Sequence, residues 1–361
     1  MTHHLTLAQA RRIVVRAQLL DADRPGDVVE VAEQLGYIKI DPTATIAPAE
    51  QTVPWSRIGS SYDPGQLQKA VEIDRQLFEF SGAFRPMSLL PLMRPQMRRW
   101  PESEKTAQWL EANARFARDI LHRLKSEGPL LGTDIPDTAQ VRRAPDGWSG
   151  SHQVPIMLDF LLRQGKVAIV GREGRRRRWD LAERVYPPDL PEYGDDEAAR
   201  LLGERMLQAA GLAKPHWWWN GVGKTSGEAA MVEGSSTRFR VDPEAVAALD
   251  EHDDAGRVAF LNPYDSLLFE RRRLAEIFGF EYVLEQFKPK LQRRYGYFSH
   301  PILMGDRFVG MLEAEVDKDR DVLHIDEVHE FEPFETEEDE MVRAEIIDLA
   351  AWLGVGVTGL P

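Results

Sequence analysis

The stretch VPIMLDFLLRQG (residues 154–165), followed by KVAIV (166–170) and RRRWDL (176–181), decides the fold class. The first segment has apolar residues at helical spacing and ends at Gly165, as helices often do. The next two segments read as strands around GREG (171–174), whose glycines suit a turn. Helices followed by such a hairpin are typical of a winged helix, a variant of the helix-turn-helix.

Helical patterns continue on both sides of this unit. Residues 7–20 and 26–35 are amphipathic and predict two helices. Residues 102–124 predict one long polar helix, and residues 195–255 repeat the helical theme less regularly. The first half of the chain is therefore expected to be mostly helical.

The C-terminal third of the chain has strand patterns instead. Residues 302–314 and 322–326 are rich in strand-forming residues, and so are the shorter segments 282–287 and 296–298. A final helix is expected over about residues 338–353. This part of the chain should form antiparallel strands closed by a helix.

Together these patterns predict an α+β protein, predominantly α, with tandem winged-helix domains and a C-terminal β-rich element. A chain of 361 residues is too long for one ordinary core, so several domains are expected. The expected division is an N-terminal helical or winged-helix region with the candidate catalytic segment (1–100), a winged-helix domain with an arginine-rich wing (101–194), a third winged-helix-like region (195–260), and the C-terminal β-rich element with its closing helix (261–361).

The composition excludes several kinds of site. The chain has no cysteine, which rules out disulfides, thiolate metal sites and cysteine nucleophiles. The nine histidines are scattered without metal-ligand spacing, so we expect neither a metal nor another cofactor. No apolar run is long enough to cross a membrane, and the N-terminus lacks the pattern of a secretory signal. We therefore expect a cytoplasmic protein without a membrane partner.

The distribution of charge bears on nucleic-acid binding. A net charge of −14 argues against it, because such binding depends on cations placed against phosphates. Arginines nevertheless gather in three short segments, namely Arg172 with Arg175, Arg176, Arg177 and Arg178, then Arg271, Arg272 and Arg273, and finally Arg293 and Arg294. Acidic residues concentrate elsewhere, notably over 332–340. The arginines predict a basic face for duplex DNA, or solvated surfaces of a winged helix that only packs against proteins.

The segment GYIKIDP (36–42) carries the candidate chemistry. Period-two alternation places Lys39 and Asp41 on one face of an extended segment, and Ile38 and Ile40 on the other. A lysine and an aspartate aimed the same way could activate a water molecule or stabilise a cation. An ordinary surface ion pair is the alternative.

Several segments together resemble the bacterial winged-helix DNA glycosylases of the YcaQ/AlkZ group. They follow the order of that family along nearly the whole chain: IDP (40–42), WSRIG (55–59), WDLAER (179–184), NPYD (262–265), ERRR (270–273), FGF (278–280), KLQRRYGY (290–297) and LMGD (303–306). The resemblance implies tandem winged helices that bind duplex DNA carrying alkylated or crosslinked bases. It also makes Trp55 and Arg57 candidate DNA contacts, beside the arginines of the three segments.

In that family the catalytic motif is Gln-x-Gln or Gln-x-Asp, and it falls here on Lys39-Ile40-Asp41. By resemblance, Asp41 activates the water that attacks the anomeric carbon and stabilises the cationic transition state. Lys39 departs from the motif, because a protonated amine cannot accept a hydrogen bond from that water. Lys39 could keep Asp41 charged, act as an amine nucleophile, or mark an inactive site. Residues 80–88 also differ from the family.

We therefore expect a DNA-binding repair protein related to monofunctional glycosylases that excise bulky N-alkylpurines or unhook interstrand crosslinks. A non-catalytic winged-helix DNA-binding or regulatory protein is the main alternative. A protein-interaction module is a third, which would suit the acidic net charge. The substitution at Lys39 separates the first interpretation from the second, and the sequence names no protein partner.

Overall fold

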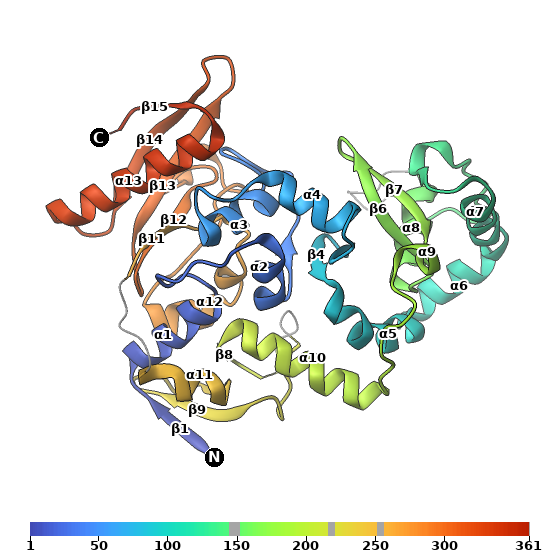
Figure 1. Cartoon of the computed structure of the whole chain (residues 1–361), viewed down its shortest axis with the longest axis horizontal. Helices are drawn as coiled ribbons and strands as arrows, with labels where there is room; N and C mark the ends of the chain where they lie inside the picture. The colour runs from blue at the N-terminus through green and yellow to red at the C-terminus, as the bar shows by residue number, and fades with distance from the viewer. Residues whose placement is uncertain (144–151, 216–220, 251–255, 361) are drawn as a thin grey trace. The chain divides into compact units, whose positions relative to one another are not determined.

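The computed structural model describes residues 1–143, 152–215, 221–250 and 256–360. The chain divides into two compact units, whose elements are labelled in Figure 1. Unit 1 comprises Met1–Gln66 and Leu202–Pro361, and unit 2 comprises Leu67–Leu201. Unit 2 is thus inserted into the sequence of unit 1. The four ranges expected from the sequence have other boundaries than these units, and that division stays a prediction.

Unit 1 contains two sheets with helices around them. Its helices are α1 (Leu7–Ala17), α2 (Val28–Leu35), α3 (Ala49–Ile58), α11 (Pro243–Ala247), α12 (Arg271–Arg273) and α13 (Thr336–Leu353), while α4 (Pro64–Glu72) and α10 (Asp195–Ala210) cross the boundary between the units. The first sheet has the order β1-β9-β10-β8, with strands Thr2–Leu5, Glu228–Val232, Arg238–Val241 and Leu212–Ala213. The second has the order β11-β12-β13-β14-β15, with strands Val258–Phe260, His300–Met304, Arg307–Asp317, Val322–Glu330 and Gly356–Thr358.

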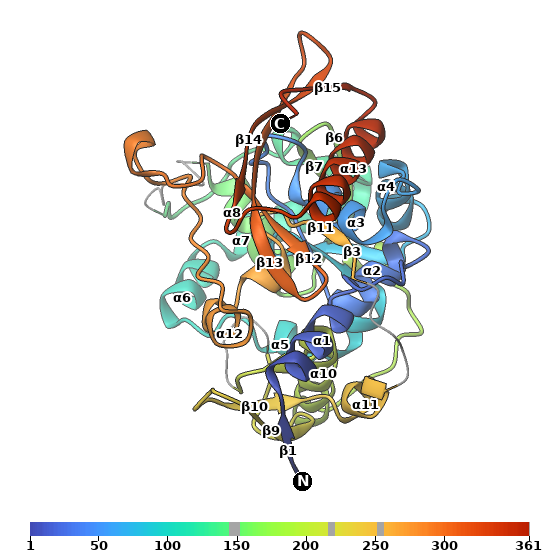
Figure 2. The same ribbon diagram turned by 90° about the vertical axis from the view of Figure 1, so that its left-hand side faces the viewer.

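One hydrophobic core joins α1 to both sheets of unit 1. Val14 of α1 belongs to the same buried cluster as Phe239 of β10 and Leu303 of β12. The start of α1 is fixed by a capping box between Thr6 and Gln9, which satisfies backbone N–H groups that the helix cannot. Helix α13 lies along the second sheet, where it contacts β11 and β15 (Figure 2).

The strands expected over 302–314 and 322–326 are present, but those expected over 282–287 and 296–298 are not. In their place the chain forms a long loop. The buried carboxylate of Glu285 accepts the backbone N–H groups of Arg294 (2.7 Å) and Tyr295 (2.8 Å). A side chain therefore satisfies backbone donors that a neighbouring strand would otherwise pair, and strand propensity alone does not reveal this.

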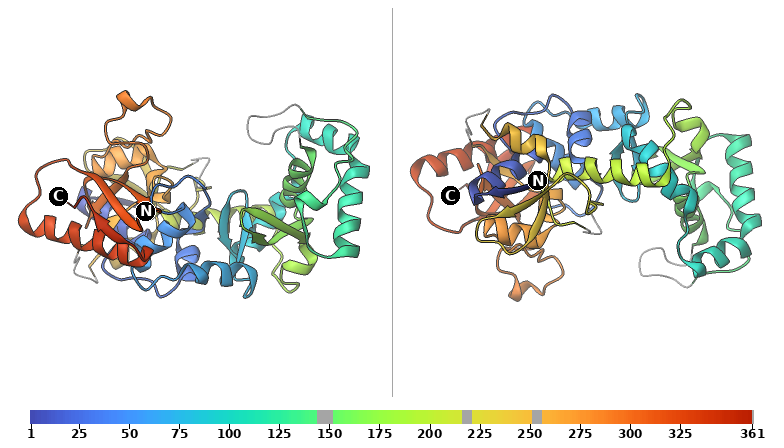
Figure 3. Two further views of the ribbon diagram at one scale, coloured as in Figure 1. Left: turned by 90° about the horizontal axis from the view of Figure 1, so that it is seen from above. Right: turned by 90° about the horizontal axis from the view of Figure 1, so that it is seen from below.

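Unit 2 is built from helices and two hairpins. Its elements are β3 (Leu77–Phe80), β4 (Ala83–Pro86), α5 (Leu90–Arg99), α6 (Glu104–Ala112), α7 (Ala114–Glu127), β5 (Leu130–Leu131), α8 (Gln153–Arg163), β6 (Val167–Glu173), β7 (Arg176–Leu181) and α9 (Ala182–Val185). Strands β5, β7 and β6 form one sheet in that order. Helices α6, α7 and α8 share a hydrophobic cluster with this sheet, and Figure 3 shows α7 beside the β6–β7 hairpin.

The long polar helix expected over 102–124 is divided between α6 and α7 at Asn113. Asn113 is fully buried, and its side chain donates to the carbonyls of Trp109 (2.9 Å) and Val141 (3.0 Å). The same side chain accepts the backbone N–H of Gln140 (2.9 Å). The break thus depends on residues 140–141, which lie far outside the helical pattern itself.

The chain is a mixed α/β protein in which both units contain helices and strands. Among the described residues, no helix has the length and apolar composition that crossing a membrane requires. A predominance of helix and the tandem winged-helix arrangement stay predictions.

Candidate functional site

The segment that carries Lys39 and Asp41 is held in place by the end of α2. Asp27 caps the N-terminus of α2 by accepting the N–H groups of Val29 (2.8 Å) and Glu30 (2.9 Å). At the other end Gly36 has φ of 73°, in the left-handed region that favours glycine, and turns the chain into β2 (Ile38–Lys39). Ile38 is fully buried.

Lys39 and Asp41 are both half-buried, so the predicted face is open in part. Ile40 is also half-buried, so of the two isoleucines predicted to face inward only Ile38 is fully buried. The ammonium group of Lys39 donates to the carbonyl oxygen of Ile40 (3.1 Å). Within the described residues Asp41 has no ion-pair partner. The two side chains therefore do not form the simple surface pair that the sequence left open.

The carboxylate of Asp41 is oriented by its own backbone. Oδ1 accepts the N–H of Thr43 (2.9 Å), as in an Asx turn, while Oδ2 has no hydrogen-bond donor among the described residues. One carboxylate oxygen of Asp41 is thus oriented by the backbone, and the other is available to accept a hydrogen bond. Further along, the carbonyl of Thr45 accepts the N–H of Val316 (2.9 Å), which ties this segment to β13.

A second carboxylate meets the segment from α3. Glu50 accepts the backbone N–H of Asp41 through Oε2 (3.2 Å). Glu50 stands in the first turn of α3, where the helix dipole favours a negative charge. The sequence interpretation missed Glu50 as a site residue, since nothing in its spacing from Asp41 distinguishes it from other acidic residues.

A cavity of about 40 Å³ lies beside Tyr37, lined also by Gln18, Glu270 and Arg273. It has room for a water molecule or two and is too small for a purine base. Burial lowers the pKa of the Arg273 guanidinium and raises the pKa of the Glu270 carboxyl. This cavity is therefore not a pocket for a base.

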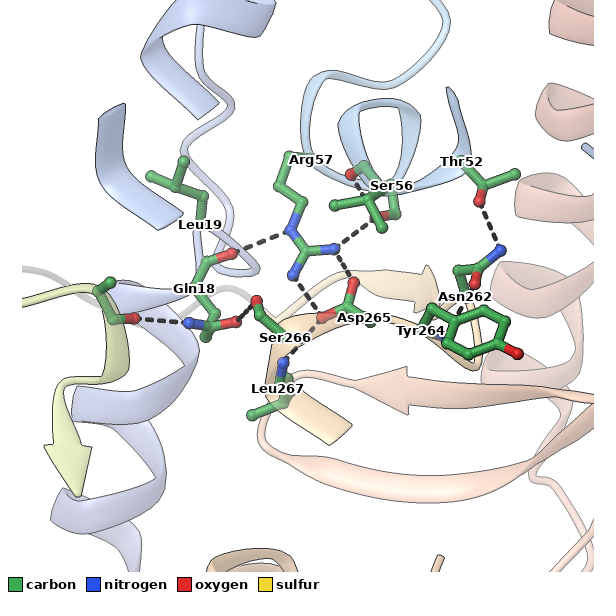
Figure 4. A network of polar contacts seen from close by, with 12 residues as sticks. Gln18, Leu19, Thr52, Ser56, Arg57, Asn262, Tyr264, Asp265, Ser266 and Leu267 are labelled. Carbon is green, nitrogen blue, oxygen red and sulfur yellow. Dashed lines mark hydrogen bonds and ion pairs between the residues drawn. The ribbon is translucent and has the colours of Figure 1, made fainter. Parts of the chain in front are cut away.

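Trp55 and Arg57, both expected to contact DNA, are buried in unit 1. Figure 4 shows Arg57 paired with Asp265 through both terminal nitrogens, one of which lies 2.9 Å from Oδ1. Arg57 also donates to the carbonyl of Gln18 (3.1 Å) and to Ser56 (2.8 Å). We therefore do not retain Trp55 and Arg57 as DNA contacts, because both side chains are buried and each guanidinium nitrogen of Arg57 donates to a group inside the protein.

The same network explains the NPYD segment (262–265). Asn262 donates to the hydroxyl of Thr52 in α3 (2.9 Å), and Asp265 holds Arg57 of the same helix. Asp265 also accepts the N–H of Leu267 (3.0 Å). These contacts fix α3, and with it Glu50, against the C-terminal part of the chain (Figure 4).

The arginines of the β6–β7 hairpin divide into two sets. Arg172 and Arg177 both pair with the buried carboxylate of Glu79, at 2.8 and 2.6 Å. Arg176 (3.5 Å) and Arg178 (3.7 Å) lie near the exposed Glu173. Arg175, at the turn, is exposed and has no partner among the described residues. Arg172 and Arg177 thus share a buried carboxylate, whereas Arg175, Arg176 and Arg178 have only an exposed partner or none in the described structure.

The arginines of the segment 271–273 are engaged within unit 1. Arg273 is buried and donates to the carbonyls of Ala210 (3.1 Å) and Leu212 (2.9 Å), while Arg271 packs 4.4 Å from the ring centre of Tyr282. Arg272 pairs with Glu276 at 2.5 Å. We therefore do not retain Arg271, Arg272 and Arg273 as a DNA-binding group.

Arg293 and Arg294 lie on the long loop of unit 1. Each covers a tyrosine ring, Arg293 at 5.0 Å from Tyr297 and Arg294 at 4.8 Å from Tyr295. Arg294 is exposed, whereas Arg293 also donates to the carbonyl of Lys288 (3.0 Å). These two arginines remain candidate contacts.

Comparison with known proteins matches the chain to a family and to a solved structure. The model of the family described as "DNA glycosylase AlkZ-like" matches residues 32–352. Among solved structures, the chain is similar to Streptomyces sahachiroi DNA glycosylase AlkZ, with a TM-score of 0.64 and 15% sequence identity. The match covers 99% of this chain and 100% of that one.

Proposed function

The chain belongs to the AlkZ-like DNA glycosylase family, and from that premise we propose that it hydrolyses the N-glycosidic bond of bulky N-alkylpurines in duplex DNA. The observation that carries the proposal is the geometry of Asp41. One of its oxygens is fixed by the N–H of Thr43 and the other has no donor among the described residues. A carboxylate held in this way suits a general base.

In the proposed reaction, Asp41 accepts a proton from a water molecule whose oxygen bonds to the anomeric carbon. The bond from that carbon to the purine nitrogen breaks as the new bond forms. Negative charge on Asp41 stabilises the cationic sugar in the transition state. An N7-alkylated purine already carries positive charge and departs as a neutral base, so no general acid is required. Glu50 acts as a positioning residue through the backbone of Asp41.

Exchange of Asp41 for asparagine tests this role. Asp41→Asn removes charge and basicity with little change of shape, so we expect base release from an N7-methylguanine duplex to slow by about 100-fold or more. Duplex affinity should stay within about twofold, because binding depends mainly on contacts to phosphates. The matched control is Asp306→Asn, in the turn between β12 and β13. Unchanged release by Asp41→Asn would remove Asp41 from the mechanism.

Lys39 favours a second candidate, a non-catalytic DNA-binding protein, because it replaces the amide of the family motif. Lys39→Gln separates the possibilities. Faster release would mean that Lys39 weakens a water-activating site. Loss of release, together with loss of an adduct trapped by borohydride in the wild type, would mean that the amine attacks the sugar.

Unit 2 supplies the proposed winged helix. The order α6, α7, β5, α8, β6, β7 and the sheet order β5-β7-β6 support it. Most of α8 is buried, and its Arg163 pairs with Asp159 (2.8 Å), so α8 offers little free positive charge to DNA. In this proposal the β6–β7 wing therefore makes the contact. Arg175, Arg176 and Arg178 would meet phosphates, while Arg172 and Arg177 position the wing through Glu79.

A further inference from the structure

The most exposed large apolar side chain of the described residues is on the long loop of unit 1. Leu291 is 100% exposed and Phe287 is 80% exposed. Both belong to the segment 286–297, which we call the tip loop. In Figure 2 this orange loop, with its short helical turn (Lys290–Gln292), stands clear of the rest of unit 1. Two such apolar side chains on one loop form a surface that is stabilised when a partner covers it.

Charge indicates the kind of partner. The tip loop contains Lys288, Lys290, Arg293 and Arg294 and no acidic residue, in a chain whose net charge is −14. Lys290 and Arg294 are exposed and have no carboxylate partner among the described residues. Cations on both sides of an apolar tip match a polyanion with an apolar interior, which is the make-up of a DNA duplex with its stacked bases.

The tip loop is held in one shape by its base. Glu285 accepts the N–H groups of Arg294 and Tyr295 and also pairs with Lys288 (2.8 Å). Gly296 has φ of 113°, and a Cβ there would collide with the carboxylate of Glu313 in β13. A loop fixed in this way loses little conformational freedom when it binds.

Two routes connect this base to the segment of Asp41. Gln286 donates to the hydroxyl of Tyr264 (2.9 Å), in the NPYD segment that also holds α3 through Asn262. On β13, Glu313 meets the tip loop and Val316 donates to Thr45, and these two residues are about 10 Å apart along the strand. The tip loop and the segment of Asp41 are therefore attached to the same parts of unit 1.

We propose that Leu291 enters the base stack of the bound duplex as a wedge, with Lys290 and Arg294 against the neighbouring phosphates. This inference rests on the proposed action on DNA. A glycosylase must take its target nucleotide out of the stack, and an inserted side chain fills the space that the nucleotide leaves. The partner that fits the tip loop is thus duplex DNA at the site of the lesion.

The test uses a duplex with 2-aminopurine beside N7-methylguanine, since 2-aminopurine fluorescence rises when the base unstacks. The full-length wild type should raise the fluorescence, and Leu291→Ser should lose most of that rise even at saturating protein. The affinity of this variant for the duplex should fall by about tenfold, because it lacks the leucine that becomes buried in the complex. The control is Ile347→Ser on α13, which removes another exposed apolar side chain (55% exposed) from unit 1 and should change neither signal.

Base release measured on the same duplex keeps the two proposals apart. A fluorescence rise that depends on Leu291 without base release would support the wedge and overturn the proposed chemistry. Base release with an undiminished rise in Leu291→Ser would overturn the wedge alone. Self-association of the protein that Leu291→Ser abolishes, with the DNA signal unchanged, would also overturn it and assign the tip loop to a protein partner.

Discussion

Arg57 of α3 and Arg175 of the β6–β7 wing were both expected to contact DNA, but their surroundings are opposite. Arg57 is completely buried and directs its donors to Asp265, Gln18 and Ser56. Arg175 is exposed at a turn. The guanidinium in unit 1 fixes the helix that carries Glu50, whereas the one in unit 2 is available to a phosphate.

Glu79 makes an intermediate case in unit 2. Its carboxylate is buried, yet the two arginines that it holds are partly exposed, with side-chain exposures of 28% for Arg172 and 37% for Arg177. Such a pair is cheaper to break than the Arg57–Asp265 pair, because the arginines can turn to water. The degree of burial therefore predicts the size of each mutational effect.

The largest effect is expected at Arg57. Arg57→Met leaves the carboxylate of Asp265 buried without its partner, which should lower the free energy of unfolding by about 3–5 kcal/mol. Urea denaturation followed by far-UV circular dichroism measures it. The double variant Arg57→Met/Asp265→Asn should regain part of the lost stability, because the buried charge is removed. A loss below about 1 kcal/mol would mean that the network is not needed for the fold.

A buried histidine gives the next effect. His300 of β12 has no hydrogen-bond partner at either ring nitrogen in the described structure, and burial lowers its pKa to about 4. The unfolded state, with a pKa near 6.5, binds the proton first as the pH falls, so stability present above pH 6.5 is lost toward pH 4. The loss should reach about 3 kcal/mol. His300→Leu should remove this part of the pH dependence, and equal slopes for both proteins would contradict the assignment.

Glu79 should show a smaller effect. Glu79→Gln keeps the shape but removes the charge that Arg172 and Arg177 share, so we expect a loss of about 1–2 kcal/mol. Hydrogen exchange should become faster in β6 and β7 and remain unchanged in α3. Equal acceleration in both units would mean that Glu79 does not act locally on the wing.

The wing tip should have almost no effect on stability. The double variant Arg175→Ala/Arg176→Ala should change the free energy of unfolding by less than about 0.5 kcal/mol. The slope of log K against log salt for duplex binding should become shallower by about one for each lost phosphate contact. Arg115→Ala on α7, another exposed arginine of unit 2, is the control and should leave the slope unchanged. A steep slope in the double variant would exclude the wing as the contact.

The comparison also explains what the sequence predicted well. Periodicity located α1, α2, α8 and the β6–β7 hairpin, because their patterns depend on residues close in sequence. The resemblance to the AlkZ group is confirmed by the family match over residues 32–352. Buried and exposed arginines could not be told apart from the sequence, since the partners of Arg57 and Arg172, namely Asp265 and Glu79, lie far away along the chain. Asn113 and Glu285, which end or replace regular elements, act through contacts of the same long-range kind.

The measurement that tests the account most directly is release of free base by the wild-type protein. A duplex with one N7-methylguanine is mixed with saturating protein, and the released base is followed by mass spectrometry in a single turnover. We predict release in step with the appearance of abasic DNA, and none from the unmodified duplex. No free base from alkylated or crosslinked duplexes, under conditions where both are fully bound, would contradict the account and leave a DNA-binding protein without glycosylase activity.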